Sequence, residues 1–146
     1  MSDADPHNLD RFRSAQTGTF ERALRELRRG RKDSHWIWFI FPQVAGLGRS
    51  PTAEKYSIRS REEAVAYLTD SHLAPRLEQC CEALLLNQGR HVSGIMGFPD
   101  DLKLRSSMTL FAELSPPDSI FHQVLSEFFD GQKDDKTLAF LLAGEP

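Results

Sequence analysis

The stretch Lys32-Asp-Ser-His-Trp-Ile-Trp-Phe-Ile-Phe-Pro-Gln43 decides how this chain folds. Its central residues 36–41 are all hydrophobic and include both tryptophans of the chain. A run this apolar must be buried in a folded protein, and it is far shorter than the roughly 20 residues that span a membrane. Polar residues stand at both ends of the run, so we expect them at the edge of the core, where pockets form.

The composition fits one globular domain. The chain has 146 residues, of which 40% are hydrophobic and 10% aromatic, enough for one core. The net charge of −3 indicates neither a nucleic-acid-binding protein nor a membrane-bound one. We therefore expect a single domain over residues 1–146, in which residues 1–7 form a loose leader.

The cysteines and the N-terminus indicate a cytoplasmic protein. Cys80 and Cys81 are adjacent, a position from which two thiols do not pair in a helix, and unpaired thiols fit a reducing compartment. The N-terminus lacks the apolar segment of a signal peptide. No apolar window is long enough to span a membrane, so no membrane partner is expected.

Helical periodicity recurs along the chain. Phe20, Ala23, Leu24 and Leu27, for example, follow the i, i+3, i+4, i+7 spacing of one helix face. Clear alternating strands and hairpin turns are missing from the sequence. The sequence thus predicts an all-α fold, a single compact multihelical domain of about eight helices, several of them short. The residues expected to cap helices are Ser34, Ser50, Ser60, Ser71 and Asp134.

The aromatic block itself has two interpretations. It could form a short helix, capped by Ser34 and stopped by Pro42, or a buried strand, because periodicity does not separate the two in so short a run. In either case we expect it to pack against a helix that carries residues 104–111. The residues expected to be mostly buried are Trp36, Phe39, Ile40 and Phe41.

A second segment, residues 97–111, repeats the design of the first, with basic residues and hydroxyls beside an apolar run. If the two segments meet, they form a basic, hydroxyl-lined pocket with tryptophan walls. Such a pocket suits a phosphate beside a flat ring. The expected ligand-binding residues are Lys32, Ser34, Trp36, Trp38, Gln43, Lys103, Arg105 and Ser106. The alternative is a pair of core helices whose polar residues cap helices or face water.

Two residues are candidates for proton transfer. His35 is a candidate because histidine is the residue type that most often acts as a general acid or base near neutral pH, and the carboxylate of Asp101 could stabilise an oxocarbenium-like state. The alternative is a histidine bonded to the backbone and an aspartate at the start of a helix. The sequence contains neither HExxH nor a Cys-x-x-Cys pair, so no metal or other cofactor is expected.

Two further features have a functional and a plain interpretation. The loop Gly46-Leu-Gly-Arg-Ser50 could cradle a phosphate at the start of the next helix, or could simply connect two elements. The basic cluster, defined as Arg22, Arg25, Arg28, Arg29, Arg31 and Lys32, could bind nucleic acid or could be a solvated helix face. Because the whole chain is acidic, we expect at most weak nucleic-acid binding.

Two blocks carry a family resemblance: Ser34-His-Trp-Ile-Trp-Phe-Ile-Phe-Pro-Gln43 and Asp101-Leu-Lys-Leu-Arg-Ser-Ser-Met-Thr-Leu-Phe111. On these blocks, and over nearly its whole length, the chain resembles family 1810 among the bacterial domain-of-unknown-function families. The resemblance implies a mainly helical single domain and brings no established activity. Members are sometimes labelled calpastatin-like. Calpastatins are disordered, whereas ten phenylalanines and two tryptophans are typical of a folded domain.

The sequence therefore favours a cytoplasmic helical domain that binds a small phosphorylated or nucleotide-like ligand. An N-glycosidase or related hydrolase is the enzyme that the same residues would make. The first alternative is a non-enzymatic protein-interaction module, which would expose an apolar patch and have a protein partner. The second alternative is weak nucleic-acid binding through the basic cluster.

Overall fold

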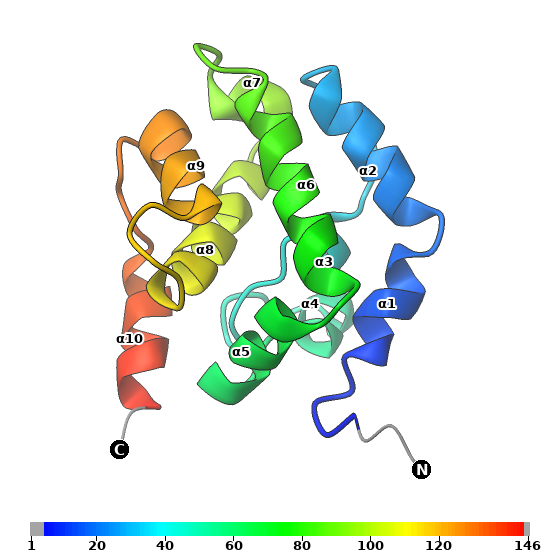
Figure 1. The fold of residues 1–146 in the computed structure, drawn as a ribbon, viewed down its shortest axis with the longest axis vertical. Coiled ribbons are helices and arrows are strands. Elements are labelled where there is room, and N and C mark those ends of the chain that lie inside the picture. The colour runs from blue at the N-terminus through cyan, green and yellow to red at the C-terminus, as the bar shows by residue number, and fades with distance from the viewer. Residues whose placement is uncertain (1–4, 145–146) are drawn as a thin grey trace.

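The computed structural model describes residues 5–144, which form ten helices and no strand (Figure 1). The helices are α1 (Asp10–Gln16), α2 (Thr19–Arg28), α3 (Ile37–Ile40), α4 (Pro51–Lys55), α5 (Arg61–Thr69), α6 (Leu73–Leu85), α7 (Val92–Met96), α8 (Asp100–Glu113), α9 (Ile120–Phe129) and α10 (Asp135–Ala143). The all-α prediction is confirmed. Helices α3, α4 and α7 have five residues or fewer, in line with the expectation that several helices are short.

Helix α8 is the centre of the core. Eight of its 14 residues are buried, and it contacts α3, α5, α7, α9 and α10. Helix α6 lies between α2 and α9 and contacts both (Figure 1). Ring contacts run from Phe12 in α1 to Tyr67 in α5, Phe111 in α8 and Phe121 in α9, with centroid distances of 5.3, 5.3 and 5.7 Å. One aromatic core therefore joins elements that are distant in sequence.

The aromatic block forms the short helix α3, not a strand. Trp36, Ile37, Ile40 and Phe41 are at most 2% exposed, and α3 packs against α8 as predicted. Phe39 is less buried than these and contacts the ring of Tyr56 at 4.7 Å. Because residues 36, 37, 40 and 41 face inward, the turn of α3 carries residues 38 and 39 toward the surface.

Three of the predicted helix caps are confirmed, since each side chain accepts the N–H group three residues on: Ser50, Ser60 and Asp134. The other two predictions are wrong. The hydroxyl of Ser34 donates to Glu26 instead of capping α3. At the start of α6 the first backbone N–H groups donate to Asp70, not to Ser71. An aspartate carboxylate accepts two such bonds at once, which a serine hydroxyl does less well.

The start of the described chain is anchored to α1. Of the predicted leader, residues 1–4 lie outside the described residues. The carboxylate of Asp5 accepts the N–H groups of Leu9 and Asp10 at 2.8 and 2.9 Å and pairs with Arg13 at 3.2 Å. Asp5 thus satisfies N–H groups that the first turn of α1 would leave without an acceptor.

The turn that leads into the aromatic block is organised by one buried carboxylate. Glu26 is 4% exposed and accepts four hydrogen bonds. They come from the N–H groups of Asp33 and Ser34, the hydroxyl of Ser34 and the indole of Trp36, at 2.6–2.9 Å. Glu26 therefore fixes both the backbone before α3 and the ring of its largest side chain.

This arrangement predicts a pH-dependent stability. Burial by itself raises the pKa of Glu26, but the bonds from Ser34, Trp36 and Asp33 outweigh it and lower the pKa from 4.5 to about 2. The stabilisation is then complete above pH 4.5 and is lost as the pH falls toward 2. We expect Glu26→Gln to lower the free energy of unfolding at pH 7 by about 3 kcal/mol.

Urea unfolding of the wild-type protein and Glu26→Gln at pH 7, 4 and 2.5 measures this effect. The difference between the two proteins should be largest at pH 7 and should shrink steadily below pH 4.5. A difference that stays constant over this range would show that the charge of Glu26 contributes nothing.

Two further properties concern membrane spanning and the reactivity of the cysteines. No helix within residues 5–144 is long and apolar enough to cross a membrane. Cys80 and Cys81 are unpaired and buried, and burial raises the pKa of Cys80 to about 12. Its thiol stays protonated near neutral pH, so Cys80 is a core residue and not a nucleophile.

Candidate functional site

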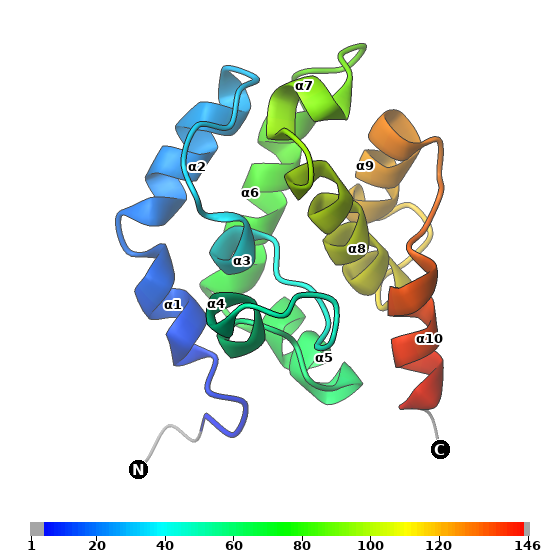
Figure 2. The same ribbon diagram turned by 180° about the vertical axis from the view of Figure 1, so that it is seen from behind.

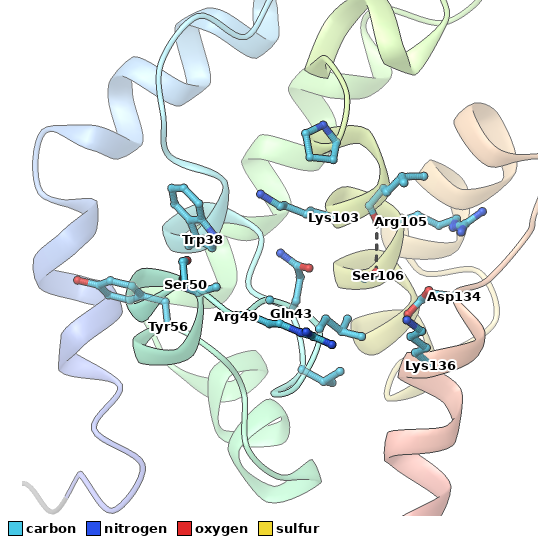
Figure 3. Close-up of a pocket in the computed structure, with 16 residues that line it drawn as sticks. Trp38, Gln43, Arg49, Ser50, Tyr56, Lys103, Arg105, Ser106, Asp134 and Lys136 are labelled. Carbon is cyan, nitrogen blue, oxygen red and sulfur yellow. Dashed lines mark hydrogen bonds between the residues drawn. The ribbon is translucent and has the colours of Figure 1, made fainter.

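A cavity of about 590 Å³ opens between the loop after α3, helix α4 and the first turns of α8 and α10 (Figure 3). Figure 2 shows that loop crossing the molecule between α3 and α5. Two of the helices that border the cavity begin at capped N-termini: Ser50 caps α4 and Asp134 caps α10. The lining includes Trp38, Gln43, Arg49, Ser50, Tyr56, Lys103, Arg105, Ser106, Asp134 and Lys136.

The two segments singled out in the sequence do meet at this cavity. Five of the expected ligand-binding residues line it: Trp38, Gln43, Lys103, Arg105 and Ser106. Trp38 and Gln43 come from α3 and the loop after it, and the other three come from α8. The hydroxyl of Ser106 donates to the carbonyl of Leu102 at 3.2 Å, so it is already engaged with its own helix.

The other three expected ligand-binding residues, Lys32, Ser34 and Trp36, do not line the cavity. Ser34 and Trp36 donate to Glu26, as described above. The side chain of Lys32 is 5% exposed, and its Nζ lies 2.8 Å from Asp100 and 4.8 Å from the centroid of the Trp36 ring. These side chains hold the aromatic block in place, and the structure does not bring them to the cavity.

Neither residue predicted to transfer protons lines the cavity. His35 is exposed just before α3, and Asp101 accepts the N–H group of Leu102 in the first turn of α8. The one acidic residue among the described lining residues is Asp134. Its carboxylate already accepts the N–H group and the hydroxyl of Thr137, at 3.0 and 2.5 Å. Among the described lining residues, Asp134 is therefore the one carboxylate, and one of its oxygens is engaged with Thr137.

Positive charge dominates the lining. Lys103 lies 3.3 Å from Asp100 and 4.9 Å from the centroid of the Trp38 ring. Within the described chain, Arg49, Arg105 and Lys136 line the cavity without forming an ion pair. The four cations outnumber the nearby carboxylates of Asp134 and Asp100, and an anion bound between the cations relieves their mutual repulsion.

Arg105 links this cavity to a second one. Figure 3 shows its side chain directed away from Trp38. With Asp134 and Lys136 it also lines an adjoining cavity of about 570 Å³. Its Nε is buried and has no acceptor among the described residues. A buried guanidinium donor without an acceptor is costly, so this part of the site favours a ligand that brings one.

Within residues 5–144, no group of three or more His, Cys, Asp or Glu side chains is placed to hold an ion. The described lining residues offer a ligand cationic groups, the amide of Gln43 and the aromatic rings of Trp38 and Tyr56.

Comparison with known proteins gives the family of this chain. The profile described as a protein of unknown function (DUF1810) matches residues 6–141. The chain belongs to the DUF1810 family. The crystal structure of the conserved hypothetical protein Rv1873 from Mycobacterium tuberculosis is similar to it, with a TM-score of 0.91 and 47% sequence identity over 94% of this chain and 99% of that chain. No curated protein matches the chain.

Tyr56 and Lys136 line the cavity of this DUF1810 protein but were not expected there from its sequence, and Arg49 was expected only as part of a possible phosphate loop. Arg49 lies in the glycine-bearing loop, for which a phosphate cradle was one of two interpretations. Nothing in the sequence around Lys136 points to the site. Its position depends on how α10 packs against α8, a contact between segments about 30 residues apart.

Proposed function

We propose that this DUF1810 protein binds a small phosphorylated ligand in the cavity between α4, α8 and α10. The observation that carries the proposal is the group of four cationic side chains, Arg49, Lys103, Arg105 and Lys136, around a space whose described lining has one carboxylate, that of Asp134. Phosphate oxygens accept charge-assisted hydrogen bonds from such groups, and guanidinium groups bind them in a bidentate manner. The volume of about 590 Å³ is in the range of small-molecule sites.

The proposed function is the binding of a ligand and does not include its hydrolysis. The N-glycosidase or hydrolase interpretation required His35 or Asp101 at the ligand, and both lie elsewhere. Hydrolysis is therefore not part of the proposed function.

The two alternatives have less support. A protein-interaction module would expose a contiguous apolar patch, but the exposed large hydrophobic residues are distributed over different helices and loops: Val65, Leu86, Phe98, Leu102 and Leu142. In the basic cluster, Arg29 and Arg31 pair with Asp33, and Lys32 is buried beside Asp100. This arrangement leaves Arg22, Arg25 and Arg28 as a solvated helix face.

Lys103→Met tests the proposal. It removes one ammonium from the cavity, and Asp100 keeps its pair with Lys32, so the fold should remain stable. Because a hydrogen bond to a charged group contributes about 1.5–3 kcal/mol, we expect the affinity for pyrophosphate to fall about ten- to a hundredfold. Isothermal titration calorimetry at low ionic strength measures it, since salt screens exposed charges.

Lys55→Met is the matched control. Lys55 also places its ammonium over an aromatic ring, at 5.3 Å from the centroid of Tyr56, but it lies outside this cavity. We expect its substitution to leave the affinity within about twofold, because the charge that it removes does not line the cavity. Equal losses in the two variants would mean that pyrophosphate responds only to net charge, and the cavity would not be its site.

A further inference from the structure

Gln43 is the lining residue whose chemistry differs from that of the cations. Figure 3 shows its side chain between Lys103 and Arg49. Its amide forms no hydrogen bond with any residue in the described part of the chain, although the residue is partly buried. A partly buried amide that both donates and accepts is therefore free for a ligand.

The backbone that carries this amide is anchored on both sides of Val44. The carbonyl of Gln43 accepts the N–H group of Ile58 at 2.8 Å, and Ala45 donates to the carbonyl of Ile58 at the same distance. These bonds form an isolated parallel bridge between Val44 and Ile58, which are 2% and 0% exposed. The side chain thus starts from an anchored segment of the loop, which is the preorganisation that a specific contact requires.

The surroundings of Gln43 limit what it can bind. A phosphate group offers oxygen acceptors, which the four cations already serve, whereas an amide also requires a donor for its own carbonyl oxygen. Trp38 and Tyr56 line the same cavity and offer aromatic surface to a flat ring. A planar group that presents a donor next to an acceptor is complementary to Gln43. Glutamine binds the edge of adenine through such a pair.

We infer that the ligand is a nucleotide, with the edge of its base bound by the amide of Gln43 beside Trp38 and Tyr56 and its phosphate bound by the cations. This inference rests on the proposed function, because it assigns the ring of the same phosphorylated ligand. It also gives Gln43 the role of a specificity-determining residue, distinct from the cations that supply affinity.

The experiment compares three probes that share a phosphate: pyrophosphate, ribose 5-phosphate and AMP. Each is titrated calorimetrically into the wild-type protein, into Gln43→Met, and into Gln123→Met as a control on the exposed face of α9. Methionine keeps the length of glutamine and removes its hydrogen bonds. We expect AMP to bind wild-type protein at least about tenfold more tightly than ribose 5-phosphate. Gln43→Met should reduce that preference about tenfold and leave the affinity for pyrophosphate unchanged, and Gln123→Met should change neither.

The other outcomes separate the two proposals. If none of the three probes binds the wild-type protein, the proposed function fails and the nucleotide inference fails with it. If ribose 5-phosphate binds as tightly as AMP, the phosphate site stands and the nucleotide inference is overturned. If AMP is preferred equally by Gln43→Met, or if Gln123→Met loses the same preference, the role given to Gln43 is overturned.

Discussion

Replacing Arg11 by methionine is expected to lower the free energy of unfolding by about 3–5 kcal/mol. The guanidinium of Arg11 pairs with Glu63 at 2.6 Å, and the two side chains are only 9% and 4% exposed. The other N–H groups of Arg11 donate at 2.6–2.8 Å to the backbone carbonyls of His7, Asn8, Lys55 and Ser57. The substitution leaves a buried carboxylate without its cation and these carbonyls without their donor, so the loss exceeds that of a surface ion pair.

Urea unfolding at pH 7 measures this loss, and Arg22→Met provides the control. Arg22 is exposed on α2, and replacing it by methionine changes the charge and the side-chain size by the same amount as Arg11→Met. Its substitution should change the free energy of unfolding by less than about 0.5 kcal/mol. If both variants are equally stable, Arg11 does not join α1 to α5 in the way described here.

Phe41→Ala is expected to cost a similar amount, about 3–5 kcal/mol, because it empties the space of a fully buried ring. Phe41 is 0% exposed, and its ring centroid lies 6.2 Å from that of Trp36. Phe39→Ala is the comparison, since Phe39 lies two residues earlier, in α3, and is only partly buried. Chemical denaturation of both variants should show the larger loss for Phe41→Ala. A larger loss for Phe39→Ala would mean that Phe39, and not Phe41, is the ring packed in the core.

The part of the fold that sequence could predict is the part that local patterns determine. Apolar spacing located the long helices, and a hydroxyl or carboxylate before a helix correctly identified the caps at Ser50, Ser60 and Asp134. Ser34 has the same local signal, yet its hydroxyl is taken by Glu26, eight residues earlier. Local sequence does not reveal that competition, because it depends on how α2 packs beside the aromatic block.

The candidate site was predictable to a similar extent. Polar residues beside two apolar runs indicated that α3 and α8 would share a pocket, and Trp38, Gln43 and Lys103 do so. The same reasoning placed His35 there. Helix α3 begins only at Ile37 and turns residues 36 and 37 into the core, which leaves His35 exposed before the helix. Arg49 and Lys136 join the site only through tertiary packing.

The two tryptophans allow the most direct test of the central claim, that the cavity binds phosphate. Their indole N–H groups give two NMR signals, one from Trp38 in the cavity and one from Trp36, which donates to Glu26 in the core. A phosphate bound by Lys103 changes the charge 4.9 Å from the centroid of the Trp38 ring. Titration with pyrophosphate should therefore shift the Trp38 signal to saturation and leave that of Trp36 in place. If neither signal moves while amide signals of α2 do, phosphate binds the basic cluster and the cavity is not the site.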